Sequence, residues 1–368
     1  MVNQNSAPNS NKQSEDNKNQ PHFDFDFIDA NEIINDAENL ENELNEGNEN
    51  KGLFTVMPAN KWIEQAKTRP IPQMLFGELW FEGELCILFA DTNLGKSILA
   101  VQIGKSISEG QQINGFKLET KKQPVLYCDF ELSDKQFENR YSIKFEQHYN
   151  FDANFIRVEI NPDANIPEKQ SFEDYLNYSL ERSIIDTGAK VLIIDNLTYL
   201  KTETEKAKDA LPLMKHLKAL KNKYGLSLLA LAHTPKRDLS KPITRNDLQG
   251  SKMLINFCDS SFSIGESATD KNLRYIKQIK QRNTEQIYDA ENVCVCQIEK
   301  PHNFLQFEFI GFGSEREHLK QHTKKDTEKQ NEKVLELSQQ GRSLREIGAE
   351  LGISHTKAGR ILNNCNKL

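Results

Sequence analysis

The sequence predicts an α/β fold with a mostly parallel central sheet, followed by a small all-α domain. Three observations predict it. Short apolar runs such as Leu85–Ala90 and Val191–Ile194 end in polar residues, as buried parallel strands do at the edge where ligands gather. Stretches with helical spacing separate these runs. Residues 329–368 carry helix-cap signals of their own, so we expect them to form a second domain.

Composition divides the chain of 368 residues into four parts. We expect a disordered acidic tail in residues 1–51, a large α/β domain in 52–312, a linker in 313–328 and a helical domain in 329–368. Within the tail, Phe23–Asp29 alternates aromatic and acidic side chains. This pattern fits either a docking motif for a protein partner or a solubilising tail.

Charge is unevenly distributed along the chain. Residues 1–50 hold 12 acidic side chains and two lysines, a net charge of −10. Residues 51–368 therefore carry +3, the difference between −7 for the whole chain and −10 for this segment. The six cysteines have no zinc-ligand spacing, and no signal peptide or long apolar run is present. We expect a reduced cytoplasmic protein without a membrane partner.

A strand, a polar turn and a helix start follow one another after Glu84. The apolar run Leu85–Ala90 leads to Gly-Lys-Ser, and the next residues have helical spacing. The backbone N–H groups of such a turn and the helix dipole bind phosphate, and the lysine reaches its outer oxygens. The alternative is a chance Gly-Lys-Ser in an ordinary turn. The residues expected to contact ATP are Ala90, Asp91, Thr92, Asn93, Leu94, Gly95, Lys96, Ser97 and Ile98.

Two further strands are expected to deliver carboxylates to the same edge. The predicted strand 124–131 ends in Glu131, and Lys190–Ile194 ends in Asp195. We expect Asp195 and the Ser97 hydroxyl to hold Mg²⁺. Glu131 is placed to orient and deprotonate the attacking water. The alternative for Glu131 is a helix-start residue that complements the helix dipole.

A fourth apolar run, Leu226–Ala232, ends in His233. This histidine is expected either to sense the γ-phosphate or to sit in a turn and bond to the backbone. The polar loop 235–250 follows, and loops of this length are usually functional or disordered. Its cations suit a phosphate backbone. The residues expected to contact DNA here are Lys236, Arg237 and Arg245.

Lys280 and Arg282 lie two positions apart at the end of the predicted strand Arg274–Asn283. A strand points such a pair to one side. Two outward cations suit the γ-phosphate of a neighbouring subunit's ATP. The alternative is an edge strand that is blunted by charge.

Capping boxes mark two helix starts. Ser133 and Gln136 begin a helix that we expect to run to about Tyr149, and Ser343 with Glu346 begins a helix in the last domain. A third helix after Gly352 completes a helix-turn-helix outline. The alternative is a helical oligomerisation cap. The residues expected to face DNA are His355, Thr356, Lys357 and Arg360.

This ordered set resembles the RecA-like P-loop ATPases, and most closely the RepA-type replicative helicases of plasmids and mobile elements. The similarity covers about residues 60–312. Its motifs are Ala90–Ser97, Tyr127–Ser133, Val191–Asn196, Leu231–Lys236, Leu248–Ser251 and Lys280–Asn283. Ala90 and Thr284 stand where glycine is usual, and the first predicts a small steric cost in the phosphate loop. The C-terminal outline resembles the helix-turn-helix of recombinases and transposon regulators.

The resemblance implies a homohexameric ring that hydrolyses ATP with Mg²⁺ at its subunit interfaces. It assigns roles to seven residues: Lys96 and Ser97 to phosphate and metal, Asp195 to the metal shell, Glu131 to the base, His233 to sensing, and Lys280 and Arg282 to the neighbour's site. The leading hypothesis is a replicative DNA helicase. Two others are a RecA-like switch that acts without translocating and a nucleotide-sensing DNA-binding regulator.

Overall fold

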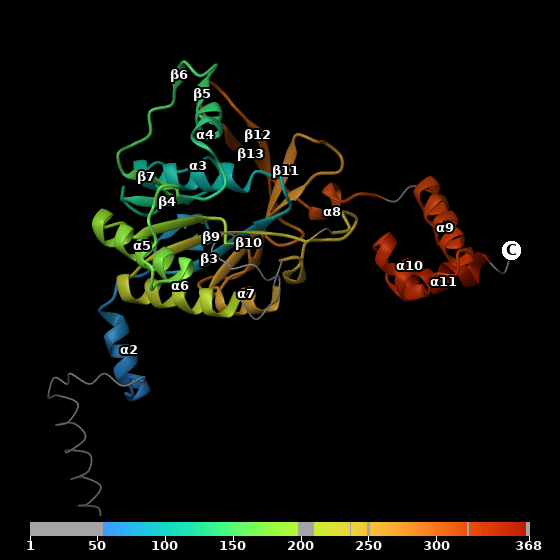
Figure 1. Ribbon diagram of the computed structural model, residues 1–368, viewed down its shortest axis with the longest axis horizontal. Helices are drawn as coiled ribbons and strands as arrows, with labels where there is room; N and C mark the ends of the chain where they lie inside the picture. Colours follow the sequence, from blue (N-terminus) through green and yellow to red (C-terminus); the bar gives the residue numbers. More distant parts are fainter. Residues whose placement is uncertain (1–53, 198–209, 236, 249–250, 322–323, 366–368) are drawn as a thin grey trace, which may run out of the picture. The chain divides into compact units, whose positions relative to one another are not determined.

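The computed structural model describes residues 54–197, 210–235, 237–248, 251–321 and 324–365 (Figure 1). The chain divides into two units, residues 1–70 and 71–368. In the described part of the first unit lies α2 (Ala59–Lys67), in which no residue is buried. The acidic tail predicted for residues 1–51 lies outside the described residues. None of the helices described is long and apolar enough to cross a membrane.

A large, mostly parallel sheet forms the centre of the second unit (Figure 1). Within the described residues it has nine strands, of which the six from β10 to β7 are parallel and the other three antiparallel. This confirms the predicted fold class. In spatial order the strands are β13 (Gln306–Gly313), β12 (Val293–Glu299), β11 (Leu273–Lys280), β10 (Ser260–Glu266), β3 (Leu85–Ala90), β9 (Ser227–His233), β8 (Val191–Asp195), β4 (Val125–Asp129) and β7 (Phe155–Val158).

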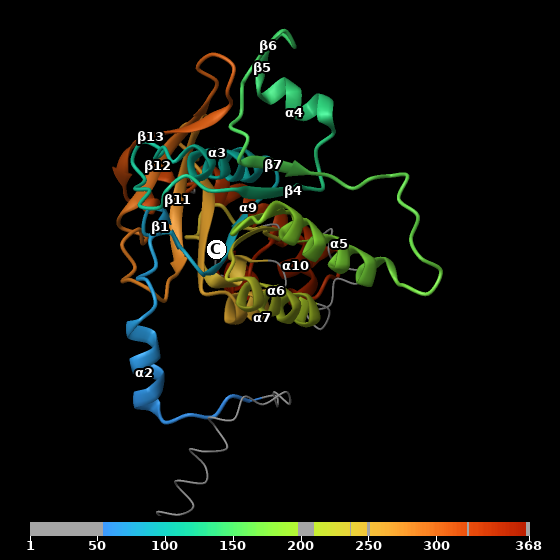
Figure 2. The ribbon, with the colours of Figure 1, turned by 90° about the vertical axis from the view of Figure 1, so that its left-hand side faces the viewer.

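Strands β3, β4, β8 and β9 are apolar along most of their length because helices cover both faces of the sheet. In β3, side chains alternate between two cores: Cys86 and Leu88 face one, and Leu85 and Ile87 face the other. Figures 1 and 2 show α3 over one face and α5, α6 and α7 over the other. These helices are α3 (Lys96–Glu109), α5 (Phe172–Thr187), α6 (Ala210–Tyr224) and α7 (Ser251–Phe257).

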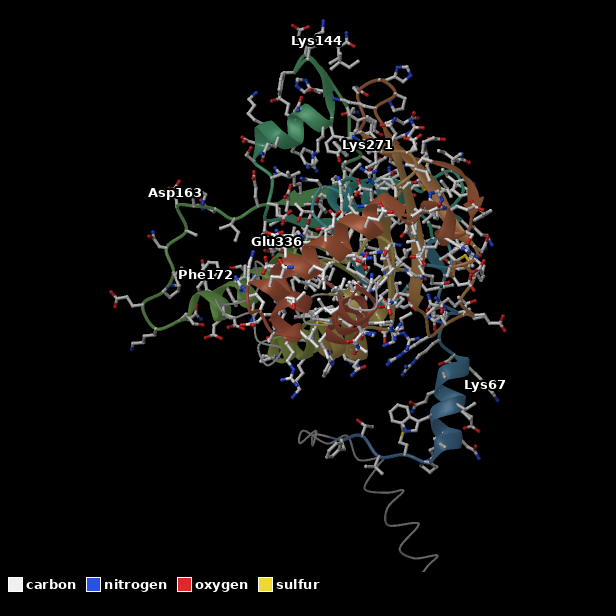
Figure 3. All side chains as sticks on the ribbon, turned by 90° about the vertical axis from the view of Figure 1, so that its right-hand side faces the viewer. Lys67, Lys144, Asp163, Phe172, Lys271 and Glu336 are labelled. Atoms are coloured by element: carbon white, nitrogen blue, oxygen red, sulfur yellow. The ribbon has the colours of Figure 1, made fainter. Side chains whose placement is uncertain are left out.

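The helix that Ser133 begins is shorter than predicted. Its capping box with Gln136 is confirmed, but α4 (Asp134–Arg140) stops well before Tyr149. A hairpin of β5 (Ser142–Ile143) and β6 (Gln147–His148) follows, with Lys144 at its tip (Figure 3). The helix ends because Tyr141 turns into a cluster of aromatic rings, where it is 2% exposed.

The packed core continues into the predicted linker. Glu315, in α8 (Glu315–His318), is 1% exposed, and its Oε2 lies 2.5 Å from Nζ of Lys277. Its Oε1 accepts a hydrogen bond from the backbone N–H of Ile243 at 2.7 Å. The polar composition of residues 313–328 predicts a linker. The sequence alone does not reveal that Glu315 has a buried cation, Lys277, as its partner.

Three helices at the end of the described chain share a small apolar cluster of their own. They are α9 (Lys324–Gln339), α10 (Leu344–Leu351) and α11 (His355–Cys365). The buried members of the cluster include Val334, Ile347 and Ala358. The capping box of Ser343 and Glu346 is confirmed, and α10 ends at Gly352 with φ 64°. The remaining short elements are β1 (Met74–Phe76), β2 (Trp80–Phe81) and the 3₁₀ turn η1 (Arg245–Asp247).

Candidate active site

The loop between β3 and α3 has the backbone of a phosphate cradle. Positive φ angles fall on Asn93 (63°) and on Gly95 (97°), which is the N-cap of α3. Asparagine tolerates this left-handed conformation better than most side chains. Ala90 is an ordinary strand residue that accepts a hydrogen bond from the N–H of Thr234. The steric cost expected for Ala90 is therefore absent, because the strain lies three residues further on.

Strands β12 and β13 support the cradle from behind. A Cβ on Gly95 would lie 2.8 Å from a methyl of Ile298 and 2.9 Å from the ring of Phe307. The Gln102 side chain of α3 donates to the carbonyl of Phe307 and accepts from its N–H, both at 2.9 Å. The phosphate loop and the first turns of α3 are therefore held in place by packing and hydrogen bonds to β12 and β13.

Lys96 turns back into the loop. Its Nζ donates to the carbonyls of Ala90 at 3.1 Å and Asp91 at 3.0 Å, and lies 3.3 Å from Nδ1 of His233. Burial lowers the pKa of the ammonium. Because an ammonium only donates, Nδ1 of His233 is the acceptor of this contact.

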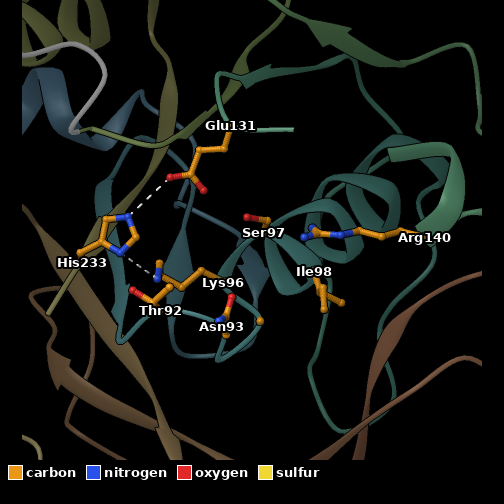
Figure 4. Close-up of a pocket in the computed structure, with 9 residues that line it drawn as sticks. Thr92, Asn93, Lys96, Ser97, Ile98, Glu131, Arg140 and His233 are labelled. Atoms are coloured by element: carbon orange, nitrogen blue, oxygen red, sulfur yellow. Dashed lines mark hydrogen bonds and ion pairs between the residues drawn. The ribbon is translucent and has the colours of Figure 1, made fainter. Parts of the chain in front are cut away.

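Glu131 faces His233 across the mouth of the loop (Figure 4). Its Oε1 lies 3.5 Å from Nε2 of the histidine, and it also accepts a hydrogen bond from the Asn196 amide. The hydrogen bond with His233 lowers the pKa of Glu131, with Lys96 adding to the effect. The carboxylate is therefore charged at neutral pH, as a proton acceptor requires.

Asp195 is buried at the end of β8. Its Oδ2 accepts a hydrogen bond from the Tyr127 hydroxyl at 2.7 Å, while Oδ1 is buried without a hydrogen-bond partner among the described residues. Burial raises its pKa to about 6. The Ser97 hydroxyl lies beside this carboxyl. Two such oxygens fit Mg²⁺, which prefers oxygen ligands.

Lys96, Glu131 and His233 line one pocket of about 200 Å³. The pocket is lined by Thr92, Asn93, Gly95, Lys96, Ser97, Ile98, Glu131, Arg140 and His233. It brings together six of the nine predicted nucleotide contacts with the predicted base and sensor. Asp195 is not part of the lining and lies next to Ser97.

Arg140 is the member of the pocket that sequence reasoning missed. It is the last residue of α4, and Figure 4 shows its side chain extending toward Ser97. One of its terminal nitrogens, Nη1, is buried and has no hydrogen-bond partner among the described residues. Its charge also lowers the pKa of Glu131. A basic residue in the last turn of a helix is ordinarily assigned to the helix dipole, so its spacing carries no separate signal.

Lys280 and Arg282 lie far from this pocket within the same chain. Because β11 runs antiparallel to β10, Lys280 pairs with Ser261 near the start of β10, at the sheet edge opposite the cradle. The prediction that Lys280 points outward is wrong, since its Nζ donates to the carbonyls of Ile255 and Cys258 at the end of α7. Arg282 is half-exposed and pairs with Asp259 at 3.2 Å.

The residues predicted to contact DNA fall into two groups. In the loop after β9, Arg237 donates to the carbonyl of Lys241 and Arg245 is exposed, whereas Lys236 lies outside the described residues. The second group is exposed along the start of α11, with Ala358 buried on the opposite side. It consists of His355, Thr356, Lys357 and Arg360.

A strand that enters a helix through such a loop, with carboxylates at the ends of neighbouring strands, defines a P-loop nucleotide-hydrolysing domain. Residues 55–238, half of the chain, match a sequence family described as an AAA domain, and the chain belongs to that family. A search of curated proteins found no match.

Proposed function

We propose that this AAA-family ATPase handles DNA as a hexameric, RepA-like replicative helicase of a plasmid or mobile element. The single observation that carries the ATPase part is the convergence of Lys96, Glu131 and His233 on one pocket beside a buried, half-satisfied Asp195. The DNA part is supported by the exposed polar face of α11, and the ring is supported by the position of Arg282 relative to the cradle.

In the proposed reaction, ATP lies along the loop with its β- and γ-phosphates against the N–H groups at the start of α3. Lys96 leaves the carbonyls of Ala90 and Asp91 for the phosphate oxygens, and Arg140 supplies a second cation from α4. Ser97 and Asp195 would hold Mg²⁺, which when bound neutralises charge on the phosphate oxygens. Glu131 accepts the proton of the attacking water.

His233 links this chemistry to the rest of the domain. It touches Lys96 with one ring nitrogen and faces Glu131 with the other. The Asn196 amide lies 3.0 Å from the second of these nitrogens, Nε2. A γ-phosphate that draws Lys96 away removes one of these partners of the ring. The histidine is followed at once by the basic loop, so its movement changes the start of a segment that is proposed to contact DNA.

The position of Arg282 supports a ring. The arginine follows Lys280, which lies at the sheet edge opposite the cradle, so the γ-phosphate that it would contact belongs to a neighbouring copy. This placement supports head-to-tail assembly, in which each ATP is completed by the next subunit. Release from Asp259, which now holds the guanidinium at 3.2 Å, is part of that assembly.

Strand displacement on a forked DNA duplex tests the proposal, with Lys96→Ala as the inactive control. We expect ATP-dependent unwinding by the native chain and none by the variant. DNA-stimulated ATP hydrolysis without unwinding would contradict the helicase and support a nucleotide switch. No ATP hydrolysis with or without DNA would contradict the ATPase itself.

A further inference from the structure

Arg157, on the edge strand β7, reaches across to the segment that carries Glu131. Its Nε donates to Oδ2 of Asp129 at 3.0 Å, and its Nη2 donates to the carbonyl of Leu132 at 2.8 Å. The centre of its guanidinium lies 4.7 Å from the ring centroid of Phe137 in α4. One side chain therefore contacts the end of β4, the turn after it and the helix that follows.

Asp129 transmits this contact to the backbone around Glu131. Its carboxyl is fully buried, and Oδ1 accepts from the N–H of Glu131 at 3.2 Å and from that of Leu132 at 3.0 Å. Oδ2 is the atom that Arg157 holds. Both carboxylate oxygens are thus occupied, one by the arginine and the other by the turn.

A buried carboxylate without its cation is costly, and it would turn toward water. Such a turn would release the N–H of Glu131 and let the catalytic side chain drift. Glu159 does not replace this function, because it pairs with Arg157 at 3.3 Å on the solvent side and is about half exposed. Ion pairs of that kind contribute little.

We propose that Arg157 is a positioning residue for Glu131, acting through Asp129 and the carbonyl of Leu132. Arg157 does not line the nucleotide pocket. It acts on Glu131 only through its contacts with Asp129 and Leu132. The proposal rests on the proposed ATPase function, in which Glu131 is the base. A base displaced by about 1 Å loses on the order of a hundredfold in rate. Nucleotide binding depends on the loop after β3 and is expected to remain.

A double-mutant cycle separates positioning from a general structural role. The variants are Arg157→Met, Glu131→Gln and the double variant, assayed for single-turnover ATP hydrolysis, for binding of a fluorescent ATP analogue and for Tm. Arg182→Met is the matched control, since Arg182 pairs with Asp186 at 3.1 Å on the exposed face of α5. We expect Arg157→Met to slow hydrolysis roughly tenfold to a hundredfold with analogue affinity within about threefold.

The decisive comparison is made in the Glu131→Gln background, where Arg157→Met is expected to cause no further loss. An equal loss in both backgrounds would overturn the proposal. If Glu131→Gln is slow but Arg157→Met is normal, the positioning role fails while the proposed base stands. If Glu131→Gln itself hydrolyses normally, the proposed base fails instead.

Arg157→Lys keeps the experiment informative if the methionine variant does not fold. A single amine retains the charge beside Asp129 but lacks the second, divergent donor for Leu132. We expect normal Tm and analogue affinity with hydrolysis reduced roughly tenfold. Native hydrolysis by this variant would show that charge alone is sufficient, and would overturn the role given to the carbonyl of Leu132.

Discussion

The Nζ of Lys96 lies 3.3 Å from Nδ1 of His233, so the phosphate-binding lysine and the histidine at the end of β9 are in direct contact. The two residues are 137 positions apart, and adjacent parallel strands bring them together. In the proposed reaction the lysine exchanges this contact for phosphate oxygens when ATP binds. Nucleotide binding would then break the contact between Lys96 and His233, which is how the histidine would sense it.

Replacing Lys96 with alanine should abolish hydrolysis, because the charge on the β- and γ-phosphates loses its cation. The matched control is Lys105→Ala in the same helix, since Lys105 pairs with Glu109 at 3.0 Å and does not line the pocket. Steady-state phosphate release checks this. Turnover at the native rate would rule out the phosphate cradle.

Arg140→Met should lower kcat/KM for ATP by about tenfold to a hundredfold, the scale of one lost charge-assisted hydrogen bond. Its Tm should be unchanged, because Nη1 has no partner among the described residues. Lys135→Met serves as control on the same helix, where Lys135 pairs with Glu138 and is largely exposed. Equal effects of the two substitutions would deny Arg140 a specific role.

Gly95→Ala should destabilise the fold more than Gly188→Ala. Both glycines have positive φ, but a Cβ at Gly95 collides with Ile298 and Phe307, whereas nothing lies within 4 Å at Gly188. Overpacking of this kind costs about 1–3 kcal/mol beyond the backbone strain that both share. Thermal denaturation compares them, and equal Tm values would mean that the backing strands yield to the extra methyl.

A chain that ends at Gln321 should keep its ATPase activity and bind duplex DNA more weakly. A chain that ends at Ser314 should instead be destabilised by about 3–5 kcal/mol, because Lys277 is left buried without Glu315. Urea denaturation and DNA-binding assays on both chains check this. Sequence-selective duplex binding by the Gln321 chain would contradict the DNA-reading role of α11.

Arg282→Ala should bind ATP and assemble, yet hydrolyse it at least about a thousandfold more slowly, as loss of a finger arginine does. Mixing it with Lys96→Ala should restore part of the activity, since some interfaces then pair an intact cradle with an intact arginine. Mixed assemblies, verified by differential tagging, that stay as inactive as either parent would exclude a trans role.

The site could be located from sequence because parallel strands buried on both faces are continuous apolar runs. The ends of β3, β4, β8 and β9 are therefore visible, and their terminal groups must meet at one edge. The pocket confirms this for Lys96, Glu131 and His233. Metal binding by Asp195 stays a prediction, although its buried, unpartnered Oδ1 supports it.

The features that the sequence did not predict depend on contacts between segments that are distant in the sequence. Lys280 turns inward because the end of α7 offers it two carbonyls, and strand periodicity cannot show that. Arg140 enters the pocket because the burial of Tyr141 ends α4 early. Glu315 belongs to the core because it meets Lys277, although its neighbours have the composition of a linker. In each case the decisive contact is with a residue distant in the sequence, so the local sequence pattern does not reveal it.

Strands β12 and β13, which support the phosphate loop, are synthesised after the other described strands of the sheet. Phe307 is synthesised 205 residues after its partner Gln102, by which time β3, the loop and α3 have long emerged. Chains of this kind fold as they are made, and distant pairings are slow to form. A nascent chain that has only the matched segment 55–238 lacks the backing of Gly95. The phosphate loop therefore reaches its final geometry only after β12 and β13 have been synthesised.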